Sequence, residues 1–398
     1  MTPILVVGAG IAGLTAALET AEAGCPVILI EEQPYLGGRV AAFHQYFPKM
    51  CPPACGLEIQ YRRLRDNPLV TVLTGATLGA LDGAPGAYQA HVRMAPRYVT
   101  GACTMCGECV PPCPTKAISL PQASAWPPLY AIDRAACPPG CQACVPACRY
   151  QAIDLAQQAE TRTFSVASVV FATGWEPYDA ARLENLGYGQ FPNVVTNVMF
   201  EKIAAAGKIV RPSDGQEPRT VAFVQCAGSR DENHLPYCSS VCCAASIKQA
   251  AYIRAAYPDA RVFVFYIDIR VPGRLEQFYA KVAADDKVVF FKGKVAKVAA
   301  GEAPGDLLVY AEDAMAGKKR VLRADMVVLA TGIVPRTAGL PAALPRDEFG
   351  FAAPVSGQTG LYAAGCVHRP SEVSAAVEDA TGAALHAFQC AVRSASHG

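Results

Sequence analysis

Residues 3–21 read PILVVGAGIAGLTAALETA, and this stretch decides the fold of the chain. An apolar strand runs directly into the turn Gly8-x-Gly10-x-x-Gly13, and an alanine-rich helix follows. The first glycine permits the tight turn, the second lets a phosphate approach the backbone, and the third lets helix and strand pack closely. The amino end of the helix adds free N–H groups and a partial positive charge. The pattern predicts a Rossmann-like unit that binds a dinucleotide.

The next strand supports a bound nucleotide rather than a glycine-rich turn without a ligand. The apolar run 27–30 ends at Glu31, where an acidic side chain binds ribose hydroxyls in such units. Strand, glycine turn, helix, second strand and acid therefore occur in the expected order. The expected nucleotide contacts in this region are Gly8, Ala9, Gly10, Ile11, Ala12, Gly13, Glu31 and Glu32.

Later segments favour FAD over NAD. Gly38 and Arg39 follow the acid, and Gly360-Leu-Tyr-Ala-Ala-Gly365-Cys366 precedes a long helix, as in FAD-binding disulfide reductases. That motif usually carries Asp where this chain has Cys366, which leaves one ribityl contact in question. Two buried strands end in Ala-Thr-Gly, at Thr173-Gly174 and at Thr331-Gly332, where such flavoproteins leave and re-enter the FAD domain. We expect Thr173, Gly174, Gly332, Gly365 and Cys366 to complete the FAD site.

Eight cysteines lie in two runs between residues 101 and 155. The first run is Cys103-x2-Cys106-x2-Cys109-x3-Cys113-Pro, and the second is Cys137-x3-Cys141-x2-Cys144-x3-Cys148. The first run has the bacterial ferredoxin spacing, in which the fourth cysteine ligates the other cluster. We therefore expect two [4Fe–4S] clusters with crossed ligands, one on Cys103, Cys106, Cys109 and Cys148, the other on Cys137, Cys141, Cys144 and Cys113.

Zinc knuckles and a disulfide framework are the alternatives for these eight cysteines. Zinc sites seldom hold four thiolates so closely spaced within one run, and nothing in the sequence indicates secretion. The two runs therefore favour iron–sulfur clusters and a protein that transfers electrons.

A second α/β unit follows, with apolar strands at 220–225 and 261–268 and a helix at 244–257. A related reductase would carry a second glycine turn for NAD(P)H after the first of these strands, but here the strand runs into Cys226. We expect no NAD(P)H site, and infer a third [4Fe–4S] cluster on Cys226, Cys238, Cys242 and Cys243. Adjacent cysteines rarely share a cluster, so buried structural cysteines and a redox disulfide stay open as alternatives.

The segments 224–231 and 237–243 resemble the signature of the flavoprotein family to which the A subunit of heterodisulfide reductase belongs, and the resemblance extends over nearly the whole chain. In that family the matching cysteines hold a cluster close to the flavin. The segment 50–58, MCPPACGLE, looks more like the short homologue, the A subunit of the quinone-interacting membrane-bound oxidoreductase complex of dissimilatory sulfur metabolism. Cys51 and Cys55 in it are candidates for a redox pair beside the flavin, with a loop holding two buried thiols as the alternative.

The short homologue implies partners and a location. The partners would be a second flavin/iron–sulfur subunit, a haem-bearing membrane subunit that faces the quinone pool, and adenylylsulfate reductase. The chain would then be cytoplasmic and attached to the inner membrane through a partner subunit. The alternative functions are a heterodisulfide-reductase-like flavoprotein acting on thiols or disulfides, with or without bifurcation at the flavin, and a non-catalytic assembly scaffold.

Composition agrees with a protein that has a large core or large subunit interfaces. Apolar residues make up 52% of the 398 residues and charged residues 17%. A formal net charge of +1 gives no basic footprint for nucleic acid or an anionic membrane surface. Seventeen cysteines require a reducing compartment if most are to bind metal. No stretch reaches the roughly 20 apolar residues of a membrane span, and the apolar amino terminus lacks the basic flank of a signal peptide.

The predicted fold class is α/β, with two Rossmann-like dinucleotide-binding domains of the disulfide-reductase type and an inserted 2[4Fe–4S] ferredoxin-like unit. We place the FAD domain at residues 1–96, 158–180 and 327–398, the insertion at 97–157, and the nucleotide-like domain at 181–326.

Overall fold

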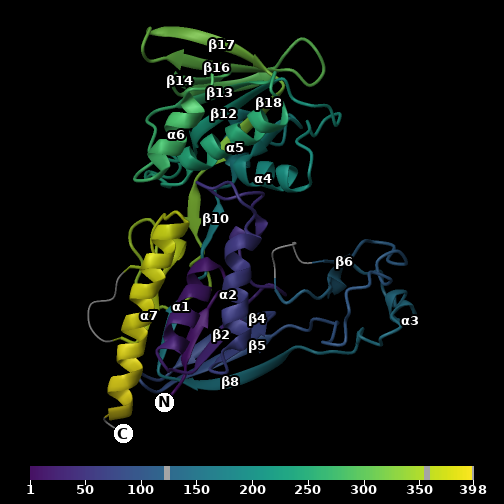
Figure 1. The fold of residues 1–398 in the computed structure, drawn as a ribbon, viewed down its shortest axis with the longest axis vertical. Helices are drawn as coiled ribbons and strands as arrows, with labels where there is room; N and C mark the ends of the chain where they lie inside the picture. Colours follow the sequence, from purple (N-terminus) through teal and green to yellow (C-terminus); the bar gives the residue numbers. More distant parts are fainter. Residues whose placement is uncertain (121–125, 354–358, 397–398) are drawn as a thin grey trace.

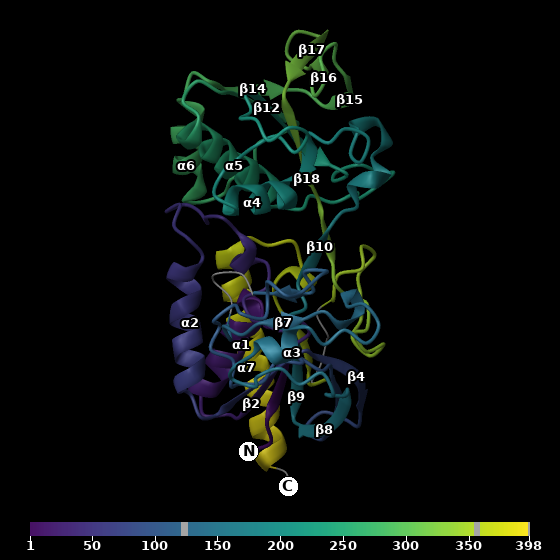
Figure 2. The same ribbon diagram turned by 90° about the vertical axis from the view of Figure 1, so that its right-hand side faces the viewer.

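The computed structural model describes residues 1–120, 126–353 and 359–396. Two α/β units are stacked along the long axis, and a smaller unit with β6, β7 and α3 projects from the side of the first (Figures 1 and 2). Both chain termini lie at the end of the first unit that points away from the second.

The first unit is built on a parallel sheet in the order β20-β9-β1-β2-β3. Its strands are β1 (Ile4–Val7), β2 (Val27–Glu31), β3 (Val70–Thr74), β9 (Ser168–Phe171) and β20 (Leu361–Ala363). Their side chains alternate between two buried clusters, so both faces of this sheet are covered. This is why the strands are nearly continuous apolar runs in the sequence.

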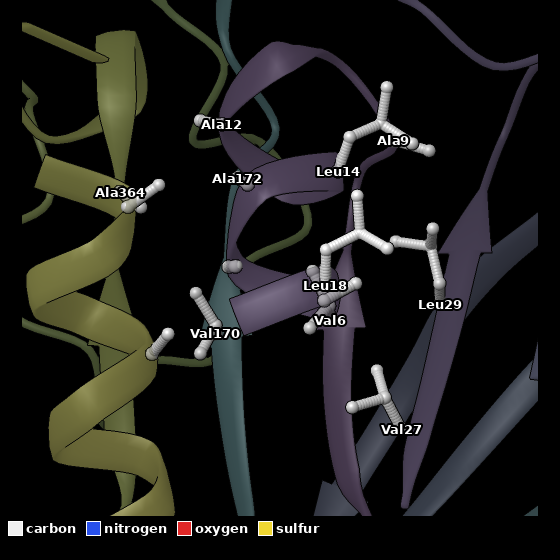
Figure 3. Packing of buried hydrophobic residues seen from close by; sticks show 14 of the residues in the cluster. Val6, Ala9, Ala12, Leu14, Leu18, Val27, Leu29, Val170, Ala172 and Ala364 are labelled. Carbon is white, nitrogen blue, oxygen red and sulfur yellow. The ribbon is translucent and has the colours of Figure 1, made fainter. Parts of the chain in front are cut away.

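Helices cover one face of this sheet and a small antiparallel sheet covers the other. The helices are α1 (Ile11–Glu22), α2 (Ala54–Asp66) and α7 (Val373–Ser396). Figure 3 shows Leu14 and Leu18 of α1 packed toward Val6 and Leu29 of the sheet. The opposite layer consists of β4 (Ala76–Asp82), β5 (Tyr88–Met94) and β8 (Glu160–Val166).

The second unit repeats this plan with the parallel order β11-β18-β12-β13-β14. The strands are β11 (Val194–Thr196), β12 (Thr220–Ala227), β13 (Arg261–Tyr266), β14 (Val288–Lys292) and β18 (Met326–Thr331). On one face lie α4 (Asn197–Ala205), α5 (Cys242–Ala256) and α6 (Leu275–Ala283). On the other lies an antiparallel layer of β15 (Val295–Ala300), β16 (Leu307–Asp313) and β17 (Lys318–Ala324).

One predicted domain boundary differs from the structure. We expected the FAD domain to resume at residue 327, but β18 pairs with β11 and β12 and completes the second sheet. The return therefore falls after Thr331, where β19 (Ile333–Pro335) pairs antiparallel with β10 (Trp175–Pro177). These two short strands connect the units in both directions.

The smaller unit lies between β5 and β8, as the predicted insertion does. It contains β6 (Ile118–Ser119), β7 (Ala131–Ile132) and α3 (Cys144–Ala147) around a small core of its own. Trp126 attaches it to the FAD domain: its carbonyl accepts from Leu36 N at 2.7 Å, and its ring stacks on that of Tyr61 with 6.3 Å between centroids.

Five short 3-10 helices complete the described elements: Val40–Ala42, Arg134–Ala136, Ala180–Arg182, Glu184–Leu186 and Gly365–Val367. Within the ranges given above, no helix has the length and apolar character that a membrane crossing requires.

Candidate functional site

The glycine turn forms an open cradle at the amino end of α1. Gly8 has a φ of +98°, and a Cβ there would collide with the Ala172 carbonyl, whereas a Cβ on Gly13 would collide with the Gly8 carbonyl. At these two positions the absence of a side chain is needed so that neighbouring backbone segments can pack closely. Gly10 differs, because the nearest atom to a Cβ there is Gly38 Cα at 3.9 Å. The space beside Gly10 is therefore available to a ligand, and it suits a diphosphate at a helix amino terminus.

Glu31 is placed by two backbone amides. Its Oε2 accepts from Ala9 N at 2.7 Å and its Oε1 from Gln33 N at 2.9 Å. Burial raises the pKa of this carboxyl, although both N–H groups act in the opposite direction. The carboxylate thus holds the glycine turn in shape and lies on the cavity wall where a ribose would bind.

A cavity of about 1670 Å³ extends from the glycine turn to the second unit. Most of the predicted FAD residues line it, namely Gly8, Gly10, Ile11, Ala12, Glu31, Glu32, Gly38, Arg39, Thr173, Gly174 and Cys366. Four others are not on its wall: Ala9, Gly13, Gly332 and Gly365. Gly332 instead faces the second unit, where a Cβ would meet Ser229, Ser239 and Leu235. The cavity is large enough and correctly lined for FAD.

Two arginines on the cavity wall hold the connecting strands. Arg39 donates from Nε to the Trp175 carbonyl at 2.8 Å, and its guanidinium lies 4.3 Å from the Trp175 ring centroid. Arg336, which the sequence pattern did not single out, pairs with Glu32 at 2.7 Å and with Glu176 at 3.1 Å. These contacts of Arg39 and Arg336 fix the segments through which the chain passes between the two units.

The unusual Cys366 lies on the cavity wall beside a compensating carboxylate. Burial raises the pKa of Cys366 to about 11, so the thiol is neutral, and it donates to the Ser371 carbonyl at 3.2 Å. Asp379 of α7 accepts from Gly365 N at 2.7 Å and pairs with His368 at 3.1 Å. A carboxylate from the helix, and not from position 366, therefore orients this turn.

The first three cysteines of the first run, together with Cys148, surround one small cavity. Cys103, Cys106, Cys109 and Cys148 line it together with Tyr130. Burial raises the pKa of the Cys109 thiol, and the negative charges of the other three raise it further. The structure thus brings together the four residues that the crossed-ligand pattern predicted.

The other four cysteines of the two runs show the same effect on the pKa of a buried thiol. Burial raises the pKa of the Cys144 thiol, and Cys137, Cys141 and Cys113 add to the effect. The fourth cysteine of each run accepts an equivalent hydrogen bond from the residue four positions later. Cys113 Sγ accepts from Ala117 N at 3.2 Å, and Cys148 Sγ accepts from Ala152 N at 3.3 Å. N–H bonds to sulfur of this kind orient cluster ligands and tune the cluster. The sequence repeat is therefore also a structural repeat.

The third quartet gathers at the start of α5. Cys226 sits at a break in the register between β12 and β18 and has a φ of +54°. Cys242 and Cys243 form the first turn of α5. Burial raises the pKa of Cys242, and the charges of Cys226, Cys243 and Cys238 raise it further. The positive end of the α5 dipole points at this group and favours the negative charge of bound thiolates.

The third quartet lies next to the FAD cavity. Val241 and Ala245, which flank Cys242 and Cys243, belong to the cavity wall, and so do Lys248 and Gln249 one turn later. The amino end of α5 is therefore the partition between the cavity and the four cysteines. Cys51 and Cys55, in contrast, are not on the wall of the cavity.

Within the described residues, no three histidine, cysteine, aspartate or glutamate side chains form a group that could hold a metal ion. A [4Fe–4S] cluster makes a different demand, because each of its four cysteines binds a different iron and the thiolates surround a space. The residues that surround the cavity lined by Cys103, Cys106, Cys109 and Cys148 fit this demand.

A buried polar network that the sequence pattern did not reveal lies beside the third quartet. Lys248 Nζ is 2.8 Å from Glu201 Oε1 and 2.8 Å from the Gln45 carbonyl. Gln249 and Tyr252 also bond to Glu201, and the Glu201 carboxylate accepts from His44 N. The network ties the loop that follows the first FAD motif to α4 and α5.

Family models match two parts of the chain. The model for FAD dependent oxidoreductases matches residues 3–58, and that for the 4Fe-4S binding domain matches residues 96–119. These are the glycine turn with its acid and the first cysteine run. The chain is therefore an oxidoreductase with a FAD-binding and a [4Fe–4S]-binding region.

Curated relatives match almost the whole chain. The A subunit of the H(2):CoB-CoM heterodisulfide,ferredoxin reductase of Methanothermobacter marburgensis is 34% identical over 96% of this chain and 63% of its own length. The A subunit of the ferredoxin/F(420)H(2)-dependent CoB-CoM heterodisulfide reductase of Methanosarcina acetivorans is 32% identical over 97% of this chain and 53% of its own. This chain thus spans between about half and two thirds of these relatives.

Solved structures share the fold at low identity. The thioredoxin reductase of T. acidophilum superposes with a TM-score of 0.56 at 15% identity, over 98% of this chain and all of that one. That of Lactococcus lactis gives 0.56 at 14% identity, over 99% of this chain. The predicted disulfide-reductase-like α/β fold class is confirmed.

Proposed function

We propose that this chain is a member of the family of heterodisulfide reductase A subunits over the part that it spans, and that it is the FAD and iron–sulfur electron-transfer component of a heterodisulfide-reductase-like complex. The observation that carries the proposal is the position of α5. Its first turn bears two cysteines of the third quartet, and Val241 just before them and Ala245 two residues after them line the large cavity.

We assign the ligands as three sets of four. The first cluster takes Cys103, Cys106, Cys109 and Cys148, the second Cys137, Cys141, Cys144 and Cys113, and the third Cys226, Cys238, Cys242 and Cys243. When bound, FAD exchanges electrons in pairs or singly and a [4Fe–4S] cluster exchanges one at a time. The protein keeps these groups at fixed separations and sets their surroundings by burial and N–H donors.

The third quartet occupies the position at which a nucleotide-binding turn would follow β12. The strand runs into Cys226 and not into a second glycine turn. We therefore propose that the second unit binds no pyridine nucleotide, and that electrons reach or leave the flavin through cysteine-bound iron.

The names of the relatives suggest which kind of complex to propose for this chain. Their names describe complexes that act on the CoB–CoM heterodisulfide with ferredoxin, H2 or F420H2, and we propose a thiol- or disulfide-linked complex for this chain as well. The quinone-linked role was expected from the resemblance of the segment 50–58, and the relatives support the heterodisulfide-reductase-like role better. A second flavin subunit, a haem-bearing membrane subunit and adenylylsulfate reductase stay predictions from the sequence.

Anaerobic purification of the native assembly tests the proposal. We expect about twelve irons and one FAD per chain, and co-purification of a subunit with cysteine-rich cluster motifs for disulfide cleavage. Four irons or fewer would contradict the three-cluster assignment. A haem-bearing membrane subunit would favour the quinone-linked complex, and rapid flavin bleaching by NADH in the isolated chain would show that a pyridine nucleotide binds after all.

A further inference from the structure

Cys238 is held differently from the other three cysteines of the third quartet. Cys226 lies in β12, and Cys242 and Cys243 begin α5, so these three belong to regular elements of the second unit. Cys238 lies in the loop between β12 and α5, and it is half-buried where the other three are buried. A ligand on a loop needs contacts of its own to stay in place, because loops open more readily than helices and strands.

Those contacts come from the two residues that flank Cys238. The Tyr237 hydroxyl donates to the Ile333 carbonyl at 2.8 Å, and the Ser239 hydroxyl accepts from the Ile333 amide at 2.9 Å. Ile333 is the first residue of β19, and it contributes to the wall of the large cavity. Both backbone polar groups of one cavity residue are therefore bonded to the neighbours of Cys238.

The same segment of chain also lies against two other members of the quartet. Cys242 Sγ is 3.8 Å from the carbonyl oxygen of Thr331, two residues before β19 begins in full. Ser239 Oγ is 2.8 Å from Ser229 Oγ, and Ser229 N donates to the Cys226 carbonyl at 3.2 Å. Both serines are buried, so water does not compete for these bonds. The segment that enters β19 is thus a common support for the quartet.

Gly332 allows this segment to approach the loop that carries Cys238. A Cβ on Gly332 would collide with Ser229 Oγ and with Leu235 Cδ1, and it would lie 2.9 Å from Ser239 Oγ. Any side chain there would push the segment away from the loop. The glycine that the sequence pattern placed in the FAD site is therefore needed for the contact between the segment and the third quartet.

We propose that Tyr237 and Ser239 are positioning residues for the third quartet, which hold Cys238 against the wall of the FAD cavity by binding Ile333 from both sides. This inference rests on the cluster assignment of the proposed function. Each cysteine of a [4Fe–4S] group binds a different iron, so a Cys238 that moves away leaves one iron without its thiolate. The contacts with β19 therefore retain that iron and fix the separation between the third quartet and the cavity.

The first test is the holoprotein with the substitution S239A, which removes the acceptor of the buried Ile333 amide. An unsatisfied buried amide is costly, so the loop opens more readily. We expect electron paramagnetic resonance of the oxidised protein to show a [3Fe–4S] signal that the unmodified protein lacks, with a loss of about one iron per chain and unchanged flavin. S246A is the matched control, because Ser246 is equally buried one turn after Cys242, and its hydroxyl has no hydrogen-bond partner among the described residues. It should give no such signal.

The substitution Y237F tests the second contact with a milder change. The ring still packs against Phe349 and Phe351, and only the hydrogen bond to β19 is lost. We expect the same [3Fe–4S] signal at lower intensity. Y257F is the control, since Tyr257 also donates to a backbone carbonyl, that of Ile209 at 2.6 Å, but follows the opposite end of α5. It should leave the spectrum unchanged.

Thiol alkylation separates the positioning role from the cluster assignment. In the reduced full-length chain as purified, Cys238 should react about tenfold faster in S239A than in S246A, while Cys226 and Cys242 keep their rates. About eight irons in the unmodified protein would refute the third cluster of the proposed function, and the alkylation rates would still decide whether Ser239 holds Cys238. Equal Cys238 rates in S239A and S246A, or full iron in S239A without a [3Fe–4S] signal, would overturn the positioning role.

Discussion

Replacing Lys248 with methionine should destabilise the protein by about 3 to 5 kcal/mol, since it leaves the Glu201 carboxylate buried without its counter-ion. The side chains of Lys248 and Glu201 are only 3% and 7% exposed, and their charged atoms lie 2.8 Å apart. Burial lowers the pKa of Lys248, while the attraction of Glu201 opposes this change. Neither group can recover hydration once the other is removed.

The matched control is the double variant K248M/E201Q, in which neither buried charge is left alone. Replacing both partners of a buried pair is often close to neutral, so most of the loss should be regained. Urea unfolding midpoints of the two single variants and the double variant measure the coupling. If the losses in the two single variants simply add in the double variant, Lys248 contributes packing against the rings of Phe43 and Tyr252, and not charge.

The pair of Lys248 and Glu201 matters for the site because its hydrogen bonds connect the loop after the first FAD motif to α5. Lys248 and Tyr252 both bond to the Gln45 carbonyl, and Glu201 accepts from His44 N. The loop after the first FAD motif is thereby fixed to the helix that begins at Cys242 and Cys243. The separation between the FAD cavity and the third quartet thus depends on a few buried polar contacts.

The parts of the site that the sequence predicted are those encoded by contiguous residues. The Gly8-to-Gly13 turn and the two cysteine runs each fix their own local geometry, because their spacing determines which atoms can face one ligand. The crossed placement of Cys113 and Cys148 was also predictable, since both halves repeat the same pattern up to Ala117 and Ala152.

The parts that the sequence did not predict depend on residues far apart in the chain. Glu201 and Lys248 lie in ordinary amphipathic and buried helices, and only packing of α4 against α5 brings them together. The membership of β18 in the second sheet was missed for a different reason. Its run of apolar residues closely resembles that of β9, and hydrophobic periodicity does not say which sheet a buried strand joins.

The turn at Cys366 contains both a feature that the sequence predicted and one that it did not. The second FAD motif was recognisable from residues 360–366, and its departure from the usual aspartate was visible in the sequence. That Asp379 bonds to Gly365 N was not, since this carboxylate belongs to the second turn of α7 and lies outside the motif. A missing side chain can be replaced by one from another element, and the sequence pattern does not show it.

Replacing Gly10 with valine should remove bound FAD while leaving the fold and the clusters in place. Gly10 has a φ of −72° and a ψ of −173°, which any residue adopts, and a Cβ there would be 3.9 Å from its nearest neighbour. The change should therefore cost the apoprotein no more than about 1 kcal/mol, as for other substitutions at a helix N-cap. The added carbons enter the space that a diphosphate needs, so flavin content should fall at least tenfold.

The measurement is flavin and iron content of the purified variant beside a matched control. G382A changes an exposed helical glycine with open space around it, so it should keep full flavin and gain about 0.5 to 1 kcal/mol of stability. Gly8 is unsuitable for this test, because a Cβ there collides with the Ala172 backbone and would disturb the fold itself. Full flavin content in G10V would mean that the diphosphate does not bind at this turn. Loss of iron together with flavin would mean that cluster assembly depends on the bound nucleotide, since the cysteine quartets themselves lie outside the glycine turn.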